Sequence, residues 1–123
     1  PTHWIVVPTN LGWSRAEQAI MGVGVAQQAA ERFPHLRAVW GAHNTALARL
    51  RLTHQNLGYG VVADTVSRCI SFPTKHLAWK QPSDLRLIEA SVAELLFLSK
   101  VYGWCVVLPI LEKLDDNFTL VEQ

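Results

Sequence analysis

The sequence has few of the features that define several large classes of protein. Its 123 residues include only two cysteines, and charged residues make up 17%, with 11 Lys and Arg against 10 Asp and Glu. Two cysteines cannot build a disulfide framework or a zinc knuckle. A formal charge of +1 excludes a strongly basic nucleic-acid module or an acidic tail as the dominant character. Because half of the residues are hydrophobic, the composition predicts one globular domain over residues 1–123 rather than a disordered segment.

Signals for membranes and metals are also missing. No apolar run reaches the about 18 residues of a membrane span, and the first residues lack the charged-then-apolar pattern of a signal peptide. The histidines show no His-x-x-x-His spacing, so we expect no bound metal. Cys69 and Cys105 lie in apolar runs, which predicts two reduced, buried thiols. We therefore expect a cytoplasmic protein without a membrane partner.

The sequence does contain short apolar runs that alternate with segments whose apolar residues recur at helical spacing. The expected strands are residues 4–9, 60–63, 68–73, 104–109 and 118–122, and the expected helices are residues 25–33, 36–51, 85–100 and 110–115. The strands at 60–63 and 68–73 form either a hairpin or two separate strands of one sheet. This alternation is typical of an α/β fold with a mainly parallel or mixed sheet.

The helix expected at 85–100 has signals at both ends. Ser83 is the predicted N-cap, Asp84 suits the first turn, and Gly103 ends the segment. Its apolar residues recur at helical spacing and predict the side that faces the core, namely Leu85, Ile88, Val92, Leu95 and Leu96.

The loop after the first strand has the features of a diphosphate site. Ligands of open α/β sheets bind outside the carboxyl ends of the strands. Here the strand ends at Thr9 and Asn10, and the segment 21–26 (MGVGVA) then opens a helix. Its glycines allow close backbone approach, and the helix N-terminus adds partial positive charge. A lone Gly-x-Gly is also compatible with an ordinary turn, and the segment is neither a dinucleotide fingerprint nor a P-loop.

A second candidate lies after the strand at 68–73. Lys75 and His76 follow it directly, and a lysine there can pair with a phosphate or act as a general acid. A solvated loop lysine is the alternative. Trp79 could stack on a base or cover the core.

Taken in order, several segments resemble the macro domain family. They are residues 5–10 (IVVPTN), 20–29 (IMGVGVAQQA), 32–34 (RFP), 70–76 (ISFPTKH), Trp79, 82–89 (PSDLRLIE) and 106–109 (VVLP). The Thr-Lys followed by a Trp-containing loop is similar to the branch of bacterial DNA ADP-ribosyl glycohydrolase antitoxins. The resemblance implies a three-layer α/β fold, a mixed sheet flanked by helices, with an ADP-ribose cleft.

The resemblance also implies roles for individual residues. Asn10 would contact the distal ribose, and the backbone amides at residues 22–24 would bind the diphosphate and the distal ribose. Lys75 matches the lysine that is catalytic in the glycohydrolase branch. The remaining expected ligand contacts are Met21, Gly22, Val23, Gly24, Val25, Thr74, His76, Trp79 and Pro109.

Two departures from the family pattern stand out. The family usually carries an acid near its start that recognises adenine, whereas this sequence begins at the strand, leaving Asp64 as the candidate substitute. The family also has a glycine-rich loop after the Leu-Pro strand, but here Pro109 runs straight into Ile110. Since a parallel crossover needs at least about 10–12 residues, we expect a segment to be missing between Pro109 and Ile110.

These observations predict a monomer that hydrolyses ADP-ribosyl linkages on DNA or protein, with ADP-ribose as ligand and no cofactor. A non-catalytic reader of ADP-ribose or a related nucleotide metabolite is the alternative. A phosphatase acting on an ADP-ribose phosphate is a further reading of the same cleft.

Overall fold

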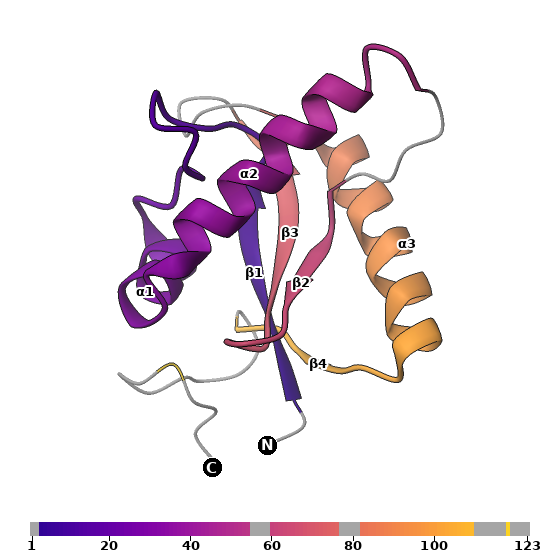
Figure 1. The fold of residues 1–123 in the computed structure, drawn as a ribbon. Coiled ribbons are helices and arrows are strands. Elements are labelled where there is room, and N and C mark those ends of the chain that lie inside the picture. The colour runs from indigo at the N-terminus through magenta and orange to yellow at the C-terminus, as the bar shows by residue number, and fades with distance from the viewer. Residues whose placement is uncertain (1–2, 55–59, 77–81, 110–117, 119–123) are drawn as a thin grey trace.

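The apolar run near the start of the chain becomes the central strand of a mixed sheet (Figure 1). The computed structural model describes residues 3–54, 60–76, 82–109 and 118. Its elements are β1 (His3–Asn10), α1 (Gly24–Arg32), α2 (His35–Leu50), β2 (Val62–Asp64), β3 (Cys69–Lys75), α3 (Leu85–Tyr102) and β4 (Cys105–Val107). The mixed α/β class predicted from the sequence is therefore confirmed.

The strand order β2-β3-β1-β4 places β1 between two parallel neighbours, while β2 runs antiparallel to β3. The segments expected at 60–63 and 68–73 thus form a hairpin. Along β1 and β3 the pairing runs from Ile5 opposite Cys69 to Asn10 opposite Lys75. This register brings two of the predicted site residues to the same edge of the sheet.

Both faces of β1 are covered, which explains why its sequence is continuously apolar. Val7 belongs to a buried cluster with residues of α1 and α2, including Ala29 and Trp40. Its neighbour Val6 belongs to a second cluster, on the opposite face, which includes Leu95 of α3. Figure 1 shows α1 and α2 on one side of the sheet and α3 on the other.

Helix α2 fixes the long loop between β1 and α1 by a very close backbone approach. A Cβ at Gly41 would lie 2.5 Å from Gln18 Cα and 2.6 Å from Ala19 N, so only glycine fits there. The Ala19 N–H also donates a 2.8 Å hydrogen bond to Arg37 O. The loop that leads into the glycine segment is therefore held against a rigid helix.

One prediction about α3 is wrong and another holds only in part. Its N-cap is Asp84, which accepts a hydrogen bond from Arg86 N, rather than Ser83. Its buried residues are Leu87, Ser91 and Leu95, so the predicted core position Leu95 is confirmed. The predicted core positions Leu85, Val92 and Leu96 are exposed instead. Ser91 lies on the inward side, and its hydroxyl donates a 2.8 Å hydrogen bond to Pro73 O, so a polar residue occupies a position that hydrophobic periodicity would not select.

The two thiols also differ from expectation. Cys69 is buried, as predicted, but Cys105 is exposed because it lies on β4 at the edge of the sheet. The helix expected at 110–115, the proposed break before Ile110 and most of the strand expected at 118–122 lie outside the described residues. Within those residues, no helix is long and apolar enough to cross a membrane.

Candidate functional site

A cleft of about 530 Å³ lies at the carboxyl ends of β1 and β3, beside the start of α1. Its lining residues are Pro8, Thr9, Asn10, Ile20, Gly22, Val23, Gly24, Val25, Ala26, Thr74 and Lys75. This volume falls in the range of small-molecule sites, about 300–1,000 Å³. The cleft therefore lies where ligands of open α/β sheets bind.

Asn10 organises the floor of this cleft. Its Nδ2 donates to Ile20 O at 3.3 Å, and its Oδ1 accepts from Gly12 N at 2.9 Å. Asn44 of α2 supports the same turn by donating to Asn10 O at 3.1 Å and to Gly12 O at 3.0 Å. The Asn10 side chain thus holds both ends of the 12–20 loop that leads into the glycine segment, while one N–H and one oxygen lone pair of its amide have no partner in these contacts.

The start of α1 forms one wall. Its N-cap is Val23, which is 67% exposed, and no side chain caps the helix. The first turn contains no acidic residue. A Cβ at Gly22 or Gly24 would have no atom within 4 Å, so both glycines border open space. Uncapped N–H groups and the helix dipole make this wall attractive to an anion.

Lys75 and Thr74 form the opposite wall at the end of β3. Lys75 is half-buried, and its carbonyl accepts from Leu11 N at 3.0 Å. Thr74 Oγ1 donates to Thr9 O at 3.1 Å, and its carbonyl accepts from Asp84 N at 2.9 Å. The lysine therefore stands on a backbone that is tied to β1 and to the start of α3. Among the described residues lining the cleft there is one cation and no carboxylate, so the site chemically favours a negatively charged ligand.

The structure brings seven of the predicted site residues to this one cleft. They are Asn10, Gly22, Val23, Gly24, Val25, Thr74 and Lys75. Met21 is buried at 2% exposure and belongs to the core under the loop. Pro109 and His76 do not line the cleft, and Trp79 lies outside the described residues.

His76 has a different partner. Its exposed ring places Nε2 2.8 Å from Asp84 Oδ2, so it joins the end of β3 to the N-cap of α3. The hydrogen bond from His76, followed by the one from Arg86 N, holds the pKa of Asp84 below its ordinary value. This contact fixes the backbone next to Lys75, a role that residue type and spacing did not signal.

Sequence reasoning missed four residues that line the cleft, namely Pro8, Thr9, Ile20 and Ala26. Pro8, Thr9 and Ala26 belong to segments that the sequence assigned to the first strand and to the helix opening, so their position next to Asn10 and Val25 was the available signal. Ile20 could not be identified, because it reaches the cleft only through the turn that Asn10 holds.

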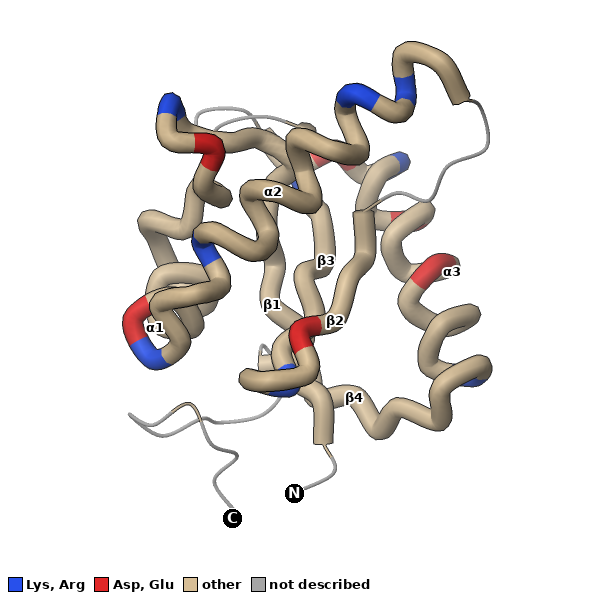
Figure 2. The backbone as a smooth tube through the Cα atoms, in the orientation of Figure 1, with Lys and Arg blue, Asp and Glu red and all other residues tan. Residues whose placement is uncertain are grey.

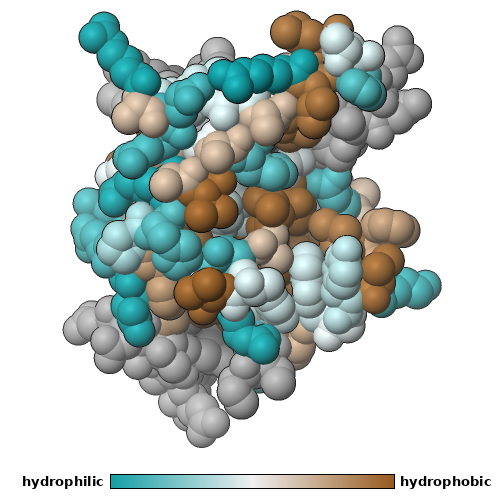
Figure 3. Space-filling view, in the orientation of Figure 1, coloured by the Kyte–Doolittle hydropathy of each residue, from teal (hydrophilic) through white to brown (hydrophobic). Residues whose placement is uncertain are grey.

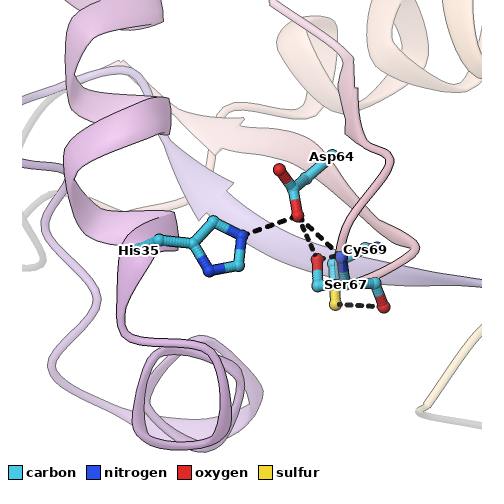
Figure 4. Close-up of polar contacts among 4 residues, drawn as sticks. All are labelled: His35, Asp64, Ser67 and Cys69. Atoms are coloured by element: carbon cyan, nitrogen blue, oxygen red, sulfur yellow. Dashed lines mark hydrogen bonds and ion pairs between the residues drawn. The ribbon is translucent and has the colours of Figure 1, made fainter.

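Asp64 lies in a separate polar cluster (Figure 4). Its Oδ2 accepts from Ser67 Oγ at 2.6 Å and from Ser67 N at 2.8 Å, and it lies 2.8 Å from His35 Nε2. Burial raises the pKa of Asp64, but the hydrogen bonds from Ser67 and His35 outweigh burial and leave its pKa lowered.

Asp64, the candidate acid for adenine, does not line the cleft. It pairs with Cys69, at the opposite end of β3 from Lys75. Those two ends are six positions apart, or roughly 20 Å at about 3.3 Å per residue. The carboxylate instead ties the β2–β3 turn to the start of α2.

The part of the chain described by the structure holds no group of three or more His, Cys, Asp or Glu side chains that could bind a metal ion. The chain matches no protein-family model, no curated protein and no solved structure.

Proposed function

We propose that the cleft binds ADP-ribose and that the protein is a macro-domain-like hydrolase of ADP-ribosyl linkages, with a three-layer arrangement of helices around its sheet. The observation that carries the proposal is one cleft with an uncapped helix N-terminus bordered by two open glycines on one side and a lysine on the other. The resemblance of segments 5–10, 20–29 and 70–76 to macro domains supports the same ligand.

The diphosphate belongs at the start of α1. The amides of Gly22, Val23 and Gly24 offer N–H groups without a competing side chain, and an anion there is stabilised by the helix dipole. The distal ribose then lies toward Asn10, whose remaining N–H and oxygen lone pair suit a ribose hydroxyl. In this arrangement Asn10 both positions the loop and contacts the ligand.

Lys75 supplies the chemistry. In hydrolysis, water adds its hydroxyl to the anomeric carbon while the bond to the acceptor breaks and the acceptor receives the proton. The ammonium of Lys75 assists ring opening or stabilises the departing group as negative charge develops on it. Its placement at the end of β3 supports this role, because backbone bonding of Lys75 to Leu11 and the bond from Thr74 to Thr9 fix the backbone that carries the ammonium group.

One observation favours a second candidate, a reader that binds ADP-ribose without turnover. The described residues lining the cleft include no carboxylate that could activate water as a general base. The two candidates predict the same affinity for ADP-ribose, and only the hydrolase releases product from a modified substrate.

The deciding experiment is a Lys75→Ala variant assayed on ADP-ribosylated DNA and on ADP-ribosylated protein. We expect the rate of hydrolysis to fall at least about 100-fold, which is the lower end of the range for losing a general acid. The Kd for ADP-ribose should change only a few-fold. Arg15→Ala, which removes an exposed cation that does not line the cleft, is the control. Unchanged turnover in Lys75→Ala would remove the lysine from the mechanism. Wild-type binding without turnover would favour the reader, and release of inorganic phosphate from an ADP-ribose phosphate would favour the phosphatase.

A further inference from the structure

The outward face of α3 carries several large apolar side chains, beside charged ones, although it points away from the core. Leu85, Leu96 and Phe97 are 68%, 64% and 66% exposed, and Val101 is 58% exposed. The side of the helix that packs on the sheet is a different one, formed by Leu87, Ser91 and Leu95. Brown side chains appear along the right-hand edge of Figure 3, where α3 lies.

The centre of this exposed face is a line of four residues, Glu89, Ala93, Leu96 and Lys100. All four are exposed, and their spacing of four, three and four positions keeps them on one side of the helix. Neither Glu89 nor Lys100 has an ion-pair partner in the described part of the chain. Figure 2 shows acidic positions along the first and middle turns of α3 and a basic position near its C-terminal end.

We propose that a second copy of this chain covers the face, with the two α3 helices antiparallel about a two-fold axis midway between Ala93 and Leu96. The spacing of the line is the same read from either end. Antiparallel pairing therefore places Glu89 of each copy opposite Lys100 of the other, and the small Ala93 opposite the large Leu96. Phe97 and Val101 flank one side of this contact, and Leu85 and Val92 flank the other.

Charge complementarity selects this occupant. A two-fold contact is self-complementary, so each charge must meet its opposite on an identical surface. The antiparallel register pairs Glu89 with Lys100 twice, whereas a parallel register would set Glu89 against Glu89 and Lys100 against Lys100. Because large and small residues alternate across the centre, the two helix axes can approach to about 8–10 Å, the usual distance between the axes of packed helices.

Charge reversal tests the register directly. Sedimentation velocity over a range of protein concentrations gives the dimer Kd of the wild type, of Glu89→Lys, of Lys100→Glu and of the double variant. Each single reversal replaces two exposed ion pairs by two like-charge contacts and should raise the dimer Kd at least about fourfold. The double variant re-forms both pairs and should return the Kd to within a few-fold of the wild type.

Two further variants distinguish this contact from non-specific hydrophobic association. Leu96→Glu should abolish the dimer, while Leu52→Glu, at an 85% exposed apolar position outside α3, should leave it unchanged. Circular dichroism establishes that each variant is folded. A wild type that stays monomeric at its highest soluble concentration, in agreement with the monomer predicted from the sequence, would overturn the proposal. So would a dimer that the double variant does not restore. The proposed dimer does not depend on ADP-ribose binding. The Kd for ADP-ribose, measured on the same samples, therefore tests the proposed function separately.

Discussion

The two glycines at the start of α1 permit a test in which stability and binding move separately. Gly24 has φ +60°, a left-handed conformation, whereas Gly22 does not have a positive φ. A Cβ at either position would have no atom within 4 Å. Placing an L-residue in the left-handed region costs about 1–2 kcal/mol, and stiffening the unfolded chain returns about 0.4–1 kcal/mol. Gly24→Ala should therefore lower the free energy of unfolding by about 1 kcal/mol, and Gly22→Ala should leave it equal or slightly higher.

For ligand binding, Gly22→Ala should be the variant with the large effect. The methyl of Gly22→Ala projects into the cleft and keeps the diphosphate from the amide at that position. Losing one hydrogen bond to a charged group costs about 1.5–3 kcal/mol, which is roughly a 10- to 150-fold increase in the Kd for ADP-ribose. Urea denaturation measures the first quantity and titration calorimetry the second.

Gly103 supplies the matched control. It also has a left-handed φ, +68°, with no atom within 4 Å of a Cβ, but it ends α3 and does not line the cleft. Gly103→Ala should reproduce the destabilisation of Gly24→Ala and leave the Kd for ADP-ribose unchanged. A folded Gly22→Ala that binds ADP-ribose within twofold of the wild type would refute the assignment of the diphosphate to this loop.

Three further predictions concern the scaffold. Gly41→Ala should lower the free energy of unfolding by about 1–3 kcal/mol, as in other overpacked sites, because its Cβ meets backbone atoms rather than a movable side chain; a neutral change in urea denaturation would contradict this close approach. Thiol labelling at neutral pH should modify Cys105 quickly and Cys69 hardly at all, since burial raises the pKa of Cys69 to about 11 and only a thiolate reacts; rapid labelling that survives in Cys105→Ser would count against the buried assignment. The lowered pKa of Asp64 means that its stabilising contribution is present above its unfolded pKa of about 3.9 and is lost as the pH falls through its folded pKa. Asp64→Asn should therefore flatten the acid side of the stability profile, and an acid profile identical to the wild type would oppose the His35–Asp64–Ser67 network as its origin.

The elements that sequence reasoning anticipated are those whose pattern is local. The apolar run at 4–9 and the glycine segment at 21–26 identified β1 and the start of α1, and these two segments meet at the cleft. Lys75 was identifiable because it follows a strand directly, and the parallel pairing of β1 with β3 then sets it opposite Asn10.

The errors arise where contacts between distant segments are involved. Periodicity assigned Leu85, Val92 and Leu96 of α3 to the core, but these are exposed, and the side that packs on the sheet includes Ser91, which donates a hydrogen bond to Pro73 O. Likewise, the contact between Asp64 and His35 joins residues that are 29 positions apart. No local pattern of either segment encodes such a contact.

The central claim is that the start of α1 and the end of β3 together hold one ADP-ribose. A titration of ADP-ribose into isotope-labelled protein, followed by the backbone amide NMR signals, tests it most directly. The account predicts saturable shifts, at one ligand per chain, that are largest at Gly22, Val23, Gly24 and Lys75, with little change at Asp64 on the far end of the sheet. Spectra that do not change, or shifts centred on Asp64 and Ser67, would contradict it.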